Sequence, residues 1–303
     1  MRRLAGFAAL GAECGVALVV GALFAMVRAL PPGFASWLGG ATLRRLGPLL
    51  PAQRRARANL RLALPELGAA EHARILRESW DNLGRMACEY VHIDRIARFD
   101  PAHPTASRLI VPPAALEAFV AMRDDGKPAL VFAAHLANWE LPAVIAAQQG
   151  MRAAALYRTP NNRFVARRIL RLRQALMGEL IPAGPAAPFR MFAALNQGAH
   201  VGMLMDQRFG RGPMVDFFGH PAATNPVFAK LARHAECPVY GVRTVREGGL
   251  RFRMEVVGPL ALPRDAAGRI DETAATAMVT GIIETWVRAA PGQWLWMHRR
   301  WRT

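Results

Sequence analysis

Cysteine and serine, on which many enzyme classes depend, are scarce in this chain of 303 residues. The three cysteines, Cys14, Cys88 and Cys237, are odd in number and widely spaced, so the sequence predicts neither a disulfide framework nor a metal cluster and favours a reducing compartment. None of the serines, at positions 36, 79 and 107, lies in a G-x-S-x-G elbow, which argues against a serine hydrolase. The chain also lacks a P-loop, a G-x-G-x-x-G fingerprint and internal repeats.

Lysine is almost absent, so arginine supplies nearly all of the positive charge behind the formal net charge of +17. The only lysines are Lys127 and Lys230. Arginine suits forked recognition of phosphate and carboxylate groups. The acidic partner of such a chain could be nucleic acid, anionic lipid or an acidic carrier protein, and the charge alone does not choose among them. Apolar residues make up 52% of the chain, which is ample for the core of one large or two small domains.

The longest apolar segment lies near the N-terminus, over residues 4–27, and only Glu13 interrupts it. At about 1.5 Å per residue, a helix of this length reaches about 36 Å, enough to cross a bilayer core of about 30 Å. A cleaved signal peptide is the alternative, but the apolar part is long and Arg28 follows it without a convincing cleavage site. More arginines follow the segment than precede it, which places the rest of the chain in the cytoplasm. We predict a membrane anchor helix over residues 1–30 and a single α/β domain over residues 31–303.

Beyond this segment, strand and helix patterns alternate, which is typical of an α/β domain. Apolar runs predict strands over residues 129–134, 151–157 and 201–205, and a hairpin over residues 238–257. Periodicity predicts helices over residues 71–91, 114–123, 161–176, 189–195, 225–234 and 274–289. The mixed basic and apolar pattern of residues 34–64 predicts short helices near a membrane surface. We expect loops over residues 100–113, 181–188 and 210–219. The C-terminal QWLWMHRRW could lie at a lipid interface or pack onto the sheet.

The stretch ALVFAAHLANWELP, residues 129–142, places a histidine between a predicted strand and a predicted helix. His135 ends the apolar run, Asn138 is a candidate helix cap, and Glu140 follows His135 by five residues. On one continuous helix, His135 and Glu140 would lie about 140° apart, so they meet only if His135 ends the strand and Glu140 lies in the first helical turn. A carboxylate on one imidazole nitrogen would leave the other free to accept a proton. The alternative is a histidine that only satisfies its hydrogen bonds at the rim of the core.

Asp206 ends a second predicted strand, as His135 ends the first. Because ligands gather at the carboxyl ends of strands in open α/β sheets, we expect the two residues to be neighbours. The alternative for Asp206 is a turn residue or an ion pair with Arg208.

The predicted helix over residues 161–176 combines an apolar stripe with many arginines. Arg168 and Arg173 flank the stripe, so helical geometry favours these two for a site. Arg163, Arg167 and Arg171 point the opposite way, toward solvent or a charged surface.

Several of these segments together resemble one known family. HLANWE resembles the H-x4-D/E motif of glycerolipid-type acyltransferases, in the H-x-x-N-W-E form of the lipid A biosynthesis (lauroyl and myristoyl) acyltransferases. The segments RARANLRLALPEL, WDNLGRMACEY, YRTPNN, GMLMDQRFG, VDFFGHPAATNP and QWLWMHRRW occur in the family's order, so the resemblance covers nearly the whole chain. It implies a glycerolipid-acyltransferase-like mixed sheet flanked by helices and preceded by an N-terminal membrane helix. Ala137 departs from the pattern, because many members have glycine there.

The resemblance implies an O-acyltransferase that moves a fatty acyl chain from a thioester to a hydroxyl group, on the cytoplasmic side of a bacterial inner membrane. The implied acceptor is the 3-hydroxyacyl chain of a phosphorylated glucosamine disaccharide lipid, a lipid A precursor. The implied donor is acyl carrier protein bearing the chain, or acyl-CoA. Acyl carrier protein, the phosphorylated glycolipid and anionic membrane lipids are then the partners, and no nucleic acid, metal or cofactor is expected.

Two alternatives to this function stay open. The nearer is an acyltransferase with another acceptor, such as a lysophospholipid, an ornithine lipid or a glycosylated phosphoinositide. The more remote is a non-enzymatic basic protein that binds membranes or nucleic acid.

The resemblance also implies roles for single residues. The family's histidine maps onto His135 as general base, and its acid maps onto Glu140, which would orient His135. The family's arginine falls on Arg173 or, after a shift of two, on Arg171. The predicted substrate-binding residues are Asn138, Arg158, Arg168, Arg171, Arg173 and Asp206.

Overall fold

The computed structural model describes residues 2–103, 107–160 and 162–301, with side chains from residue 13 onward. At its centre is a seven-stranded sheet in the order β1-β9-β8-β2-β5-β3-β4. Neighbouring strands run parallel except β8 and β9, which form an antiparallel hairpin. The predicted mixed α/β fold is therefore confirmed. The strands are β1 (Leu109–Ile110), β2 (Leu130–Ala133), β3 (Ala153–Tyr157), β4 (Glu179–Pro182), β5 (His200–Leu204), β8 (Val239–Gly248) and β9 (Arg251–Val257).

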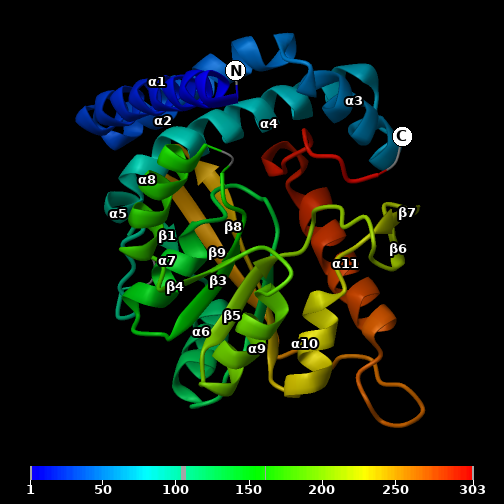
Figure 1. The fold of residues 1–303 in the computed structure, drawn as a ribbon. Helices are drawn as coiled ribbons and strands as arrows, with labels where there is room; N and C mark the ends of the chain where they lie inside the picture. The colour runs from blue at the N-terminus through cyan, green and yellow to red at the C-terminus, as the bar shows by residue number, and fades with distance from the viewer. Residues whose placement is uncertain (1, 104–106, 161, 302–303) are drawn as a thin grey trace.

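Helices cover the faces and one end of this sheet (Figure 1). One apolar core contains side chains of α6 (Pro113–Asp124) and α7 (Leu141–Gln148), and the other contains side chains of α9 (Ala187–Asn196), α10 (Val227–Ala235) and α11 (Glu272–Ala289). Across the top of the sheet in Figure 1 lie α1 (Arg2–Ala29), α2 (Pro32–Leu46), α3 (Ala52–Ala63) and α4 (Ala69–Glu89). The remaining helices are α5 (Ile93–Ile96), α8 (Arg163–Gln174) and the 3-10 turns η1 (Gly47–Leu49), η2 (Tyr90–His92) and η3 (Pro291–Gln293).

The central strands β2 and β5 bring the ends of two predicted strands to one place. They pair in parallel, from Leu130 opposite Val201 to Ala133 opposite Leu204. Their side chains are mostly apolar because helices cover both faces of the sheet. The residues that follow both strands therefore emerge at the same end of the sheet.

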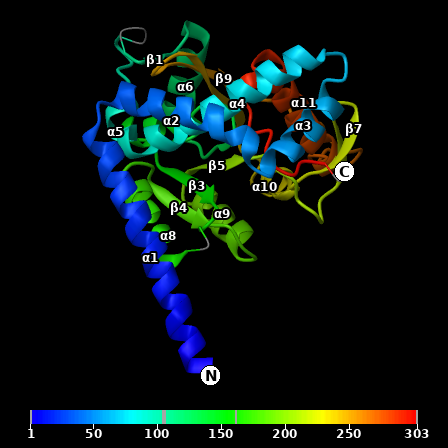
Figure 2. The ribbon, with the colours of Figure 1, turned by 90° about the horizontal axis from the view of Figure 1, so that it is seen from above.

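The prediction of a membrane-spanning anchor over residues 1–30 is not supported. Helix α1 forms, but no helix in the described chain is both long enough and apolar enough to cross a membrane. Polar contacts instead tie α1 to the domain where its side chains are described. Glu13 pairs with Arg163 of α8 at 3.3 Å, and Arg28 donates to both carboxylate oxygens of Asp94 at 2.6 and 2.8 Å. Figure 2 shows the first part of α1 extending away from the rest of the molecule.

The predicted helices and strands are present with shifted ends, and the predicted loops contain short additional strands. β1 lies in the predicted loop over residues 100–113, of which residues 104–106 are outside the described chain, and β4 ends in the loop over residues 181–188. β6 (Met214–Phe217) lies in the predicted loop over residues 210–219 and forms a hairpin with β7 (His220–Ala223), which follows that loop. These strands are too short for a clear alternation of side chains. The predicted start of α8, Asn161, is outside the described residues; Asn162 caps this helix by accepting from the N–H groups of Phe164 and Val165.

The C-terminal segment packs into the domain, which is the second of the two expected positions. Trp294, Trp296 and Trp301 are buried in the larger apolar core. Arg300 is buried with them and donates to Ala223 O at 3.0 Å and to a threonine hydroxyl at 2.7 Å. The segment thus closes the fold over the end of the sheet.

Candidate active site

A histidine and an aspartate meet where β2 and β5 end. His135 Nδ1 lies 2.7 Å from Asp206 Oδ1, and the backbone N–H of His135 donates to Asp206 Oδ2 at 2.9 Å. The predicted proximity of these two residues is confirmed. It follows from the parallel register of the two strands, which carries both residues to the same end of the sheet.

Asp206 is an ionised, buried carboxylate that accepts from three donors. It is 3% exposed, and Trp294 Nε1 donates to its Oδ2 at 2.7 Å in addition to the His135 contacts. Burial alone would raise the pKa of Asp206, but the His135 charge and the hydrogen bonds from His135 and Trp294 outweigh it and hold the pKa at about 2. Asp206 therefore acts as an acceptor for the imidazole at neutral pH.

The acceptor on Nδ1 determines which ring nitrogen of His135 can take a proton. We assign the Nδ1–H tautomer, because the ionised Asp206 can only accept. Nε2 then carries a lone pair, and the Gln207 amide donates to it at 3.1 Å. The Trp139 ring packs edge-on against the imidazole, with ring centroids 4.9 Å apart. This is the geometry of a general base held in one orientation.

Glu140 does not fill the orienting position that we predict for it, because Asp206 occupies that position. Glu140 instead forms an ion pair with Arg173, although both side chains are mostly buried. The Arg173 guanidinium also lies over the Tyr90 ring, 5.7 Å from its centroid. Burial would lower the pKa of Arg173, but the Glu140 charge outweighs it and raises the pKa above its usual value. Glu140 thus holds a permanent cation beside the site.

The other predicted arginines lie farther out. Arg171 is on the exposed face of α8, so of the two alternatives the structure places Arg173 in the site. Arg168 is exposed and packs over Phe24 of α1, 5.5 Å from the ring centroid. Arg158 is exposed and contributes to the wall of the adjoining cavity.

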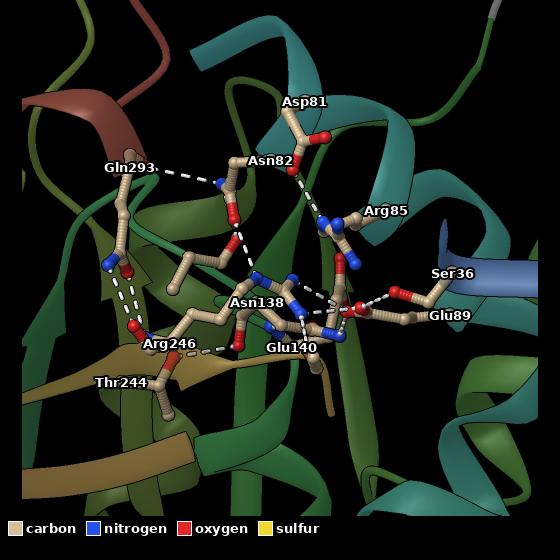
Figure 3. Close-up of polar contacts among 12 residues, drawn as sticks. Ser36, Asp81, Asn82, Arg85, Glu89, Asn138, Glu140, Thr244, Arg246 and Gln293 are labelled. Carbon is tan, nitrogen blue, oxygen red and sulfur yellow. Dashed lines mark hydrogen bonds and ion pairs between the residues drawn. The ribbon is translucent and has the colours of Figure 1, made fainter. Parts of the chain in front are cut away.

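Asn138 is buried beneath the turn rather than directed at a substrate. It is 1% exposed, its amide donates to Glu89 Oε2 at 3.0 Å, and its own carbonyl accepts from the Thr244 hydroxyl at 2.9 Å (Figure 3). The predicted helix cap is also wrong, because α7 begins at Leu141 and Asn138 Oδ1 accepts from Glu140 N at 3.3 Å in the preceding turn. Its role is to hold the turn between His135 and Glu140.

A deep apolar cavity of about 540 Å³ opens beside His135. His135, Glu140 and Arg158 line it from the turns that follow β2 and β3, and Arg173 of α8 joins them through Glu140, whereas His200 lies at the opposite end of β5. The strand between them spans roughly 13 Å at about 3.3 Å per residue. Between these ends the wall is mostly apolar, with alanines of α7 and β3 and methionines of six different segments. The methionines are Met86, Met122, Met151, Met177, Met203 and Met254.

Sequence patterns do not identify several residues that build this site. Trp294 reaches Asp206 from the far end of the chain, and Gln207 needs the ends of β2 and β5 side by side to reach His135. Tyr90 lies on an amphipathic face that predicts only core packing. The position of Gln207 directly after Asp206 is the one local signal that points to the site.

A histidine that faces an apolar cavity, with a buried aspartate behind it, is suited to removing a proton next to a bound hydrocarbon chain. Sequence comparison agrees with this class of enzyme. The family described as bacterial lipid A biosynthesis acyltransferase matches residues 11–303, so the chain belongs to that family and is an acyltransferase. Similar proteins include the lipid A biosynthesis palmitoleoyltransferase of Escherichia coli (strain K12) and a lipid A biosynthesis acyltransferase of Shigella flexneri. Each is 28% identical over 259 residues, which cover 82% of this chain and 78% of the relative.

Proposed function

We propose that this enzyme transfers a fatty acyl chain from a thioester, carried by acyl carrier protein or CoA, to a hydroxyl group of a lipid A precursor. The observation that supports this most is the position of His135 at the polar end of the apolar cavity, with Asp206 behind the ring. The cavity takes the acyl chain of the donor, and its polar end leaves the thioester carbonyl beside His135.

The chemical step needs one base and one leaving group. The acceptor hydroxyl displaces Gln207 from His135 Nε2 and attacks the thioester carbonyl carbon while Nε2 takes its proton. Asp206 stabilises the imidazolium that forms. The carbon–sulfur bond then breaks, the new ester leaves, and the imidazolium returns the proton to the thiolate. Arg173, held by Glu140, supplies positive charge for the oxyanion or for an acceptor phosphate.

Exposed arginines on α8 favour acidic partners near the cavity. Arg163, Arg167 and Arg171 face outward on this helix. Such a surface attracts an acidic carrier protein and anionic lipid headgroups. Replacing the three together by glutamine should raise the KM of the carrier-bound donor and reduce the salt dependence of that KM. Replacing Arg264 and Arg269, which lie between β9 and α11, should change neither. An unchanged KM in both variants would make the α8 arginines a merely solvated face.

Exposed apolar side chains favour contact with the surface of a membrane. Most of the large ones on the described chain lie within residues 16–50, on α1, α2 and η1, and include Phe34, Trp37 and Leu49. Arg44 and Arg45 are exposed on the same helix as Phe34 and Trp37. This combination is typical of elements that lie in a lipid interface. Sedimentation with vesicles containing an anionic lipid should therefore exceed sedimentation with neutral vesicles.

Mass spectrometry of the reaction products tests the proposed function directly. A phosphorylated, tetra-acylated lipid A precursor is incubated with the enzyme and a mixture of acyl-carrier thioesters. We expect a mass gain of one acyl group. In His135→Ala the rate of product formation should fall by about 10²–10⁴-fold, because a positioned base contributes about that factor to the rate. Normal turnover by His135→Ala would overturn the mechanism. No gain with any thioester would redirect the search to lysophospholipid, ornithine lipid or glycosylated phosphoinositide acceptors.

A further inference from the structure

An ion pair between a fully buried carboxylate and a mostly buried guanidinium lies directly behind the turn that joins His135 to Glu140. Glu89, at the end of α4, is 0% exposed, and Arg246 of β8 donates to both of its carboxylate oxygens, at 2.6 and 2.9 Å. The Ser36 hydroxyl of α2 donates to Oε1 at 2.7 Å, and the Asn138 amide donates to Oε2 at 3.0 Å. Four donor atoms from three segments, namely α2, β8 and the turn, thus converge on one carboxylate, as Figure 3 shows.

The carboxylate controls the turn through Asn138. Every polar group of this side chain is engaged: the amide nitrogen with Glu89 and the amide oxygen with the backbone N–H of Glu140. The Thr244 hydroxyl fixes the Asn138 backbone carbonyl from β8, the same strand that supplies Arg246. A displacement of Glu89 would therefore move Asn138, and with it the backbone that presents Glu140.

The remaining residues of the turn are held by the C-terminal segment and by α4. Leu295 N donates to His135 O at 3.2 Å, and Ala137 N donates to Gln293 O at 3.0 Å. Asn82 of α4 donates to Ala137 O at 3.2 Å. Arg246 shares this support, because its backbone N–H and carbonyl both bond to the Gln293 side chain, at 2.8 and 3.0 Å. The ion pair is thus the junction of α2, α4, β8 and the C-terminal segment.

We propose that Glu89 and Arg246 are positioning residues for acyl transfer, which hold the His135–Glu140 turn in its reactive geometry. This inference rests on the proposed function of His135. The charge of Glu89 is essential to it, because an ionised carboxylate offers about four acceptor sites and no donor. In Glu89→Gln the amide N–H₂ would face one of two donor pairs, either Ser36 with one Arg246 N–H or Asn138 with the other, so in both orientations Arg246 loses one of its two acceptors.

The test compares the same chemical change at two ion pairs of one hairpin. Glu89→Gln breaks the pair behind the turn. Glu255→Gln breaks the pair with Arg243, whose guanidinium lies 2.6 Å from Glu255, and also the pair with Arg253. Residues 243 and 246 point to opposite faces of β8, because their separation is odd. Arg243 contacts Trp286 O of α11 and lies away from the turn. Glu255→Gln therefore reports what the loss of an ion pair does to this hairpin without the catalytic turn.

For Glu89→Gln we expect kcat to fall by about 10–100-fold, the usual cost of a small misplacement of catalytic groups, with the KM of donor and acceptor nearly unchanged. Glu255→Gln should keep kcat even where its melting temperature falls. Thr244→Val removes only the hydroxyl that holds Asn138, and it should also lower kcat. If Glu89→Gln does not fold, the kcat of Thr244→Val tests the inference instead. Wild-type kcat in both Glu89→Gln and Thr244→Val would overturn the inference. His135→Ala is measured in the same experiment. If it loses turnover while Glu89→Gln and Thr244→Val keep it, the inference about Glu89 fails but the proposed role of His135 as general base remains.

Discussion

Two carboxylates lie near His135, and the difference between their surroundings separates their roles. Asp206 is bound by the histidine and by Trp294, so it controls which imidazole nitrogen is free. Glu140 is bound by Arg173, so it controls a cation at the cavity. Four residues join His135 to Glu140, but the register of β2 and β5, rather than this short connection, decides which acid meets the ring. Closeness in sequence is thus a poor guide to the partner of a histidine at a strand end.

The contrast between Asp206 and Glu140 predicts its largest loss of activity for Asp206→Asn. Oδ2 of Asp206 accepts from two N–H groups, those of His135 and Trp294, so the amide oxygen of asparagine should take that place. The amide N–H₂ would then face Nδ1, force it to accept, and put the ring proton on Nε2. A tautomer reversal of this kind costs about 10⁴-fold in kcat. We expect a loss of about 10³–10⁴-fold with a folded protein, measured as turnover of the acyl thioester.

Serine at the same position gives the matched control. Asp206→Ser is small and keeps an acceptor, so a loss much smaller than that of Asp206→Asn would support the tautomer argument. Equal turnover of Asp206→Asn and wild type would end the assignment of Asp206 as the partner of the base.

Glu140→Gln should have a smaller effect of a different kind. It keeps the shape of the side chain but leaves the mostly buried Arg173 without its counter-charge. We expect kcat/KM for the phosphorylated acceptor to fall by about 10–100-fold, because an unpaired buried charge costs several kcal/mol and the guanidinium is free to move. Steady-state kinetics with donor and acceptor varied separately measures this effect. A loss as large as that of Asp206→Asn would show that Glu140 also takes part in proton transfer, and the contrast between the two acids would fail.

The sequence predicts the sheet-end location of the site but not its connections. The apolar runs before His135 and Asp206 identify two buried strands, and the general rule for α/β sheets then brings the two residues together. The wrong partner for His135 arises because the pattern H-x4-E suggests a local pair, whereas the real pair depends on which strands are neighbours. Trp294 and Glu89 reach the site from distant segments, and no local pattern records a contact of that kind. The helix α1 shows the converse: its apolar composition predicts a span, but its contacts with Asp94 and Arg163 are decided by tertiary structure.

Acid unfolding should also distinguish Asp206 from an ordinary carboxylate. Its pKa of about 2 in the folded state is below the ordinary value of 3.8, so the folded protein binds fewer protons there than the unfolded chain. This contribution to stability is present above about pH 4 and is lost as the pH falls toward 2. It amounts to about 2 kcal/mol. Between pH 5 and pH 3, the free energy of unfolding measured with urea should fall more steeply for the wild type than for Asp206→Asn. Parallel pH profiles of the two proteins would contradict the low pKa.

The smallest expected effect is that of Ala137→Gly, in the turn that separates the two carboxylates. Ala137 has φ 48°, in the left-handed region, and is completely buried. Glycine would relieve about 1–2 kcal/mol of backbone strain. It would also lose about 0.8 kcal/mol from the buried methyl group and about 0.4–1 kcal/mol through the greater freedom of the unfolded chain. These terms nearly cancel, so we expect the free energy of unfolding to change by less than about 1 kcal/mol. Because neither the His135–Asp206 pair nor the Glu140–Arg173 pair depends on that methyl group, kcat should stay at the wild-type value. A large fall in kcat with unchanged stability would mean that the stiffness of this residue, and not only the hydrogen bonds around it, sets the distance between the two pairs.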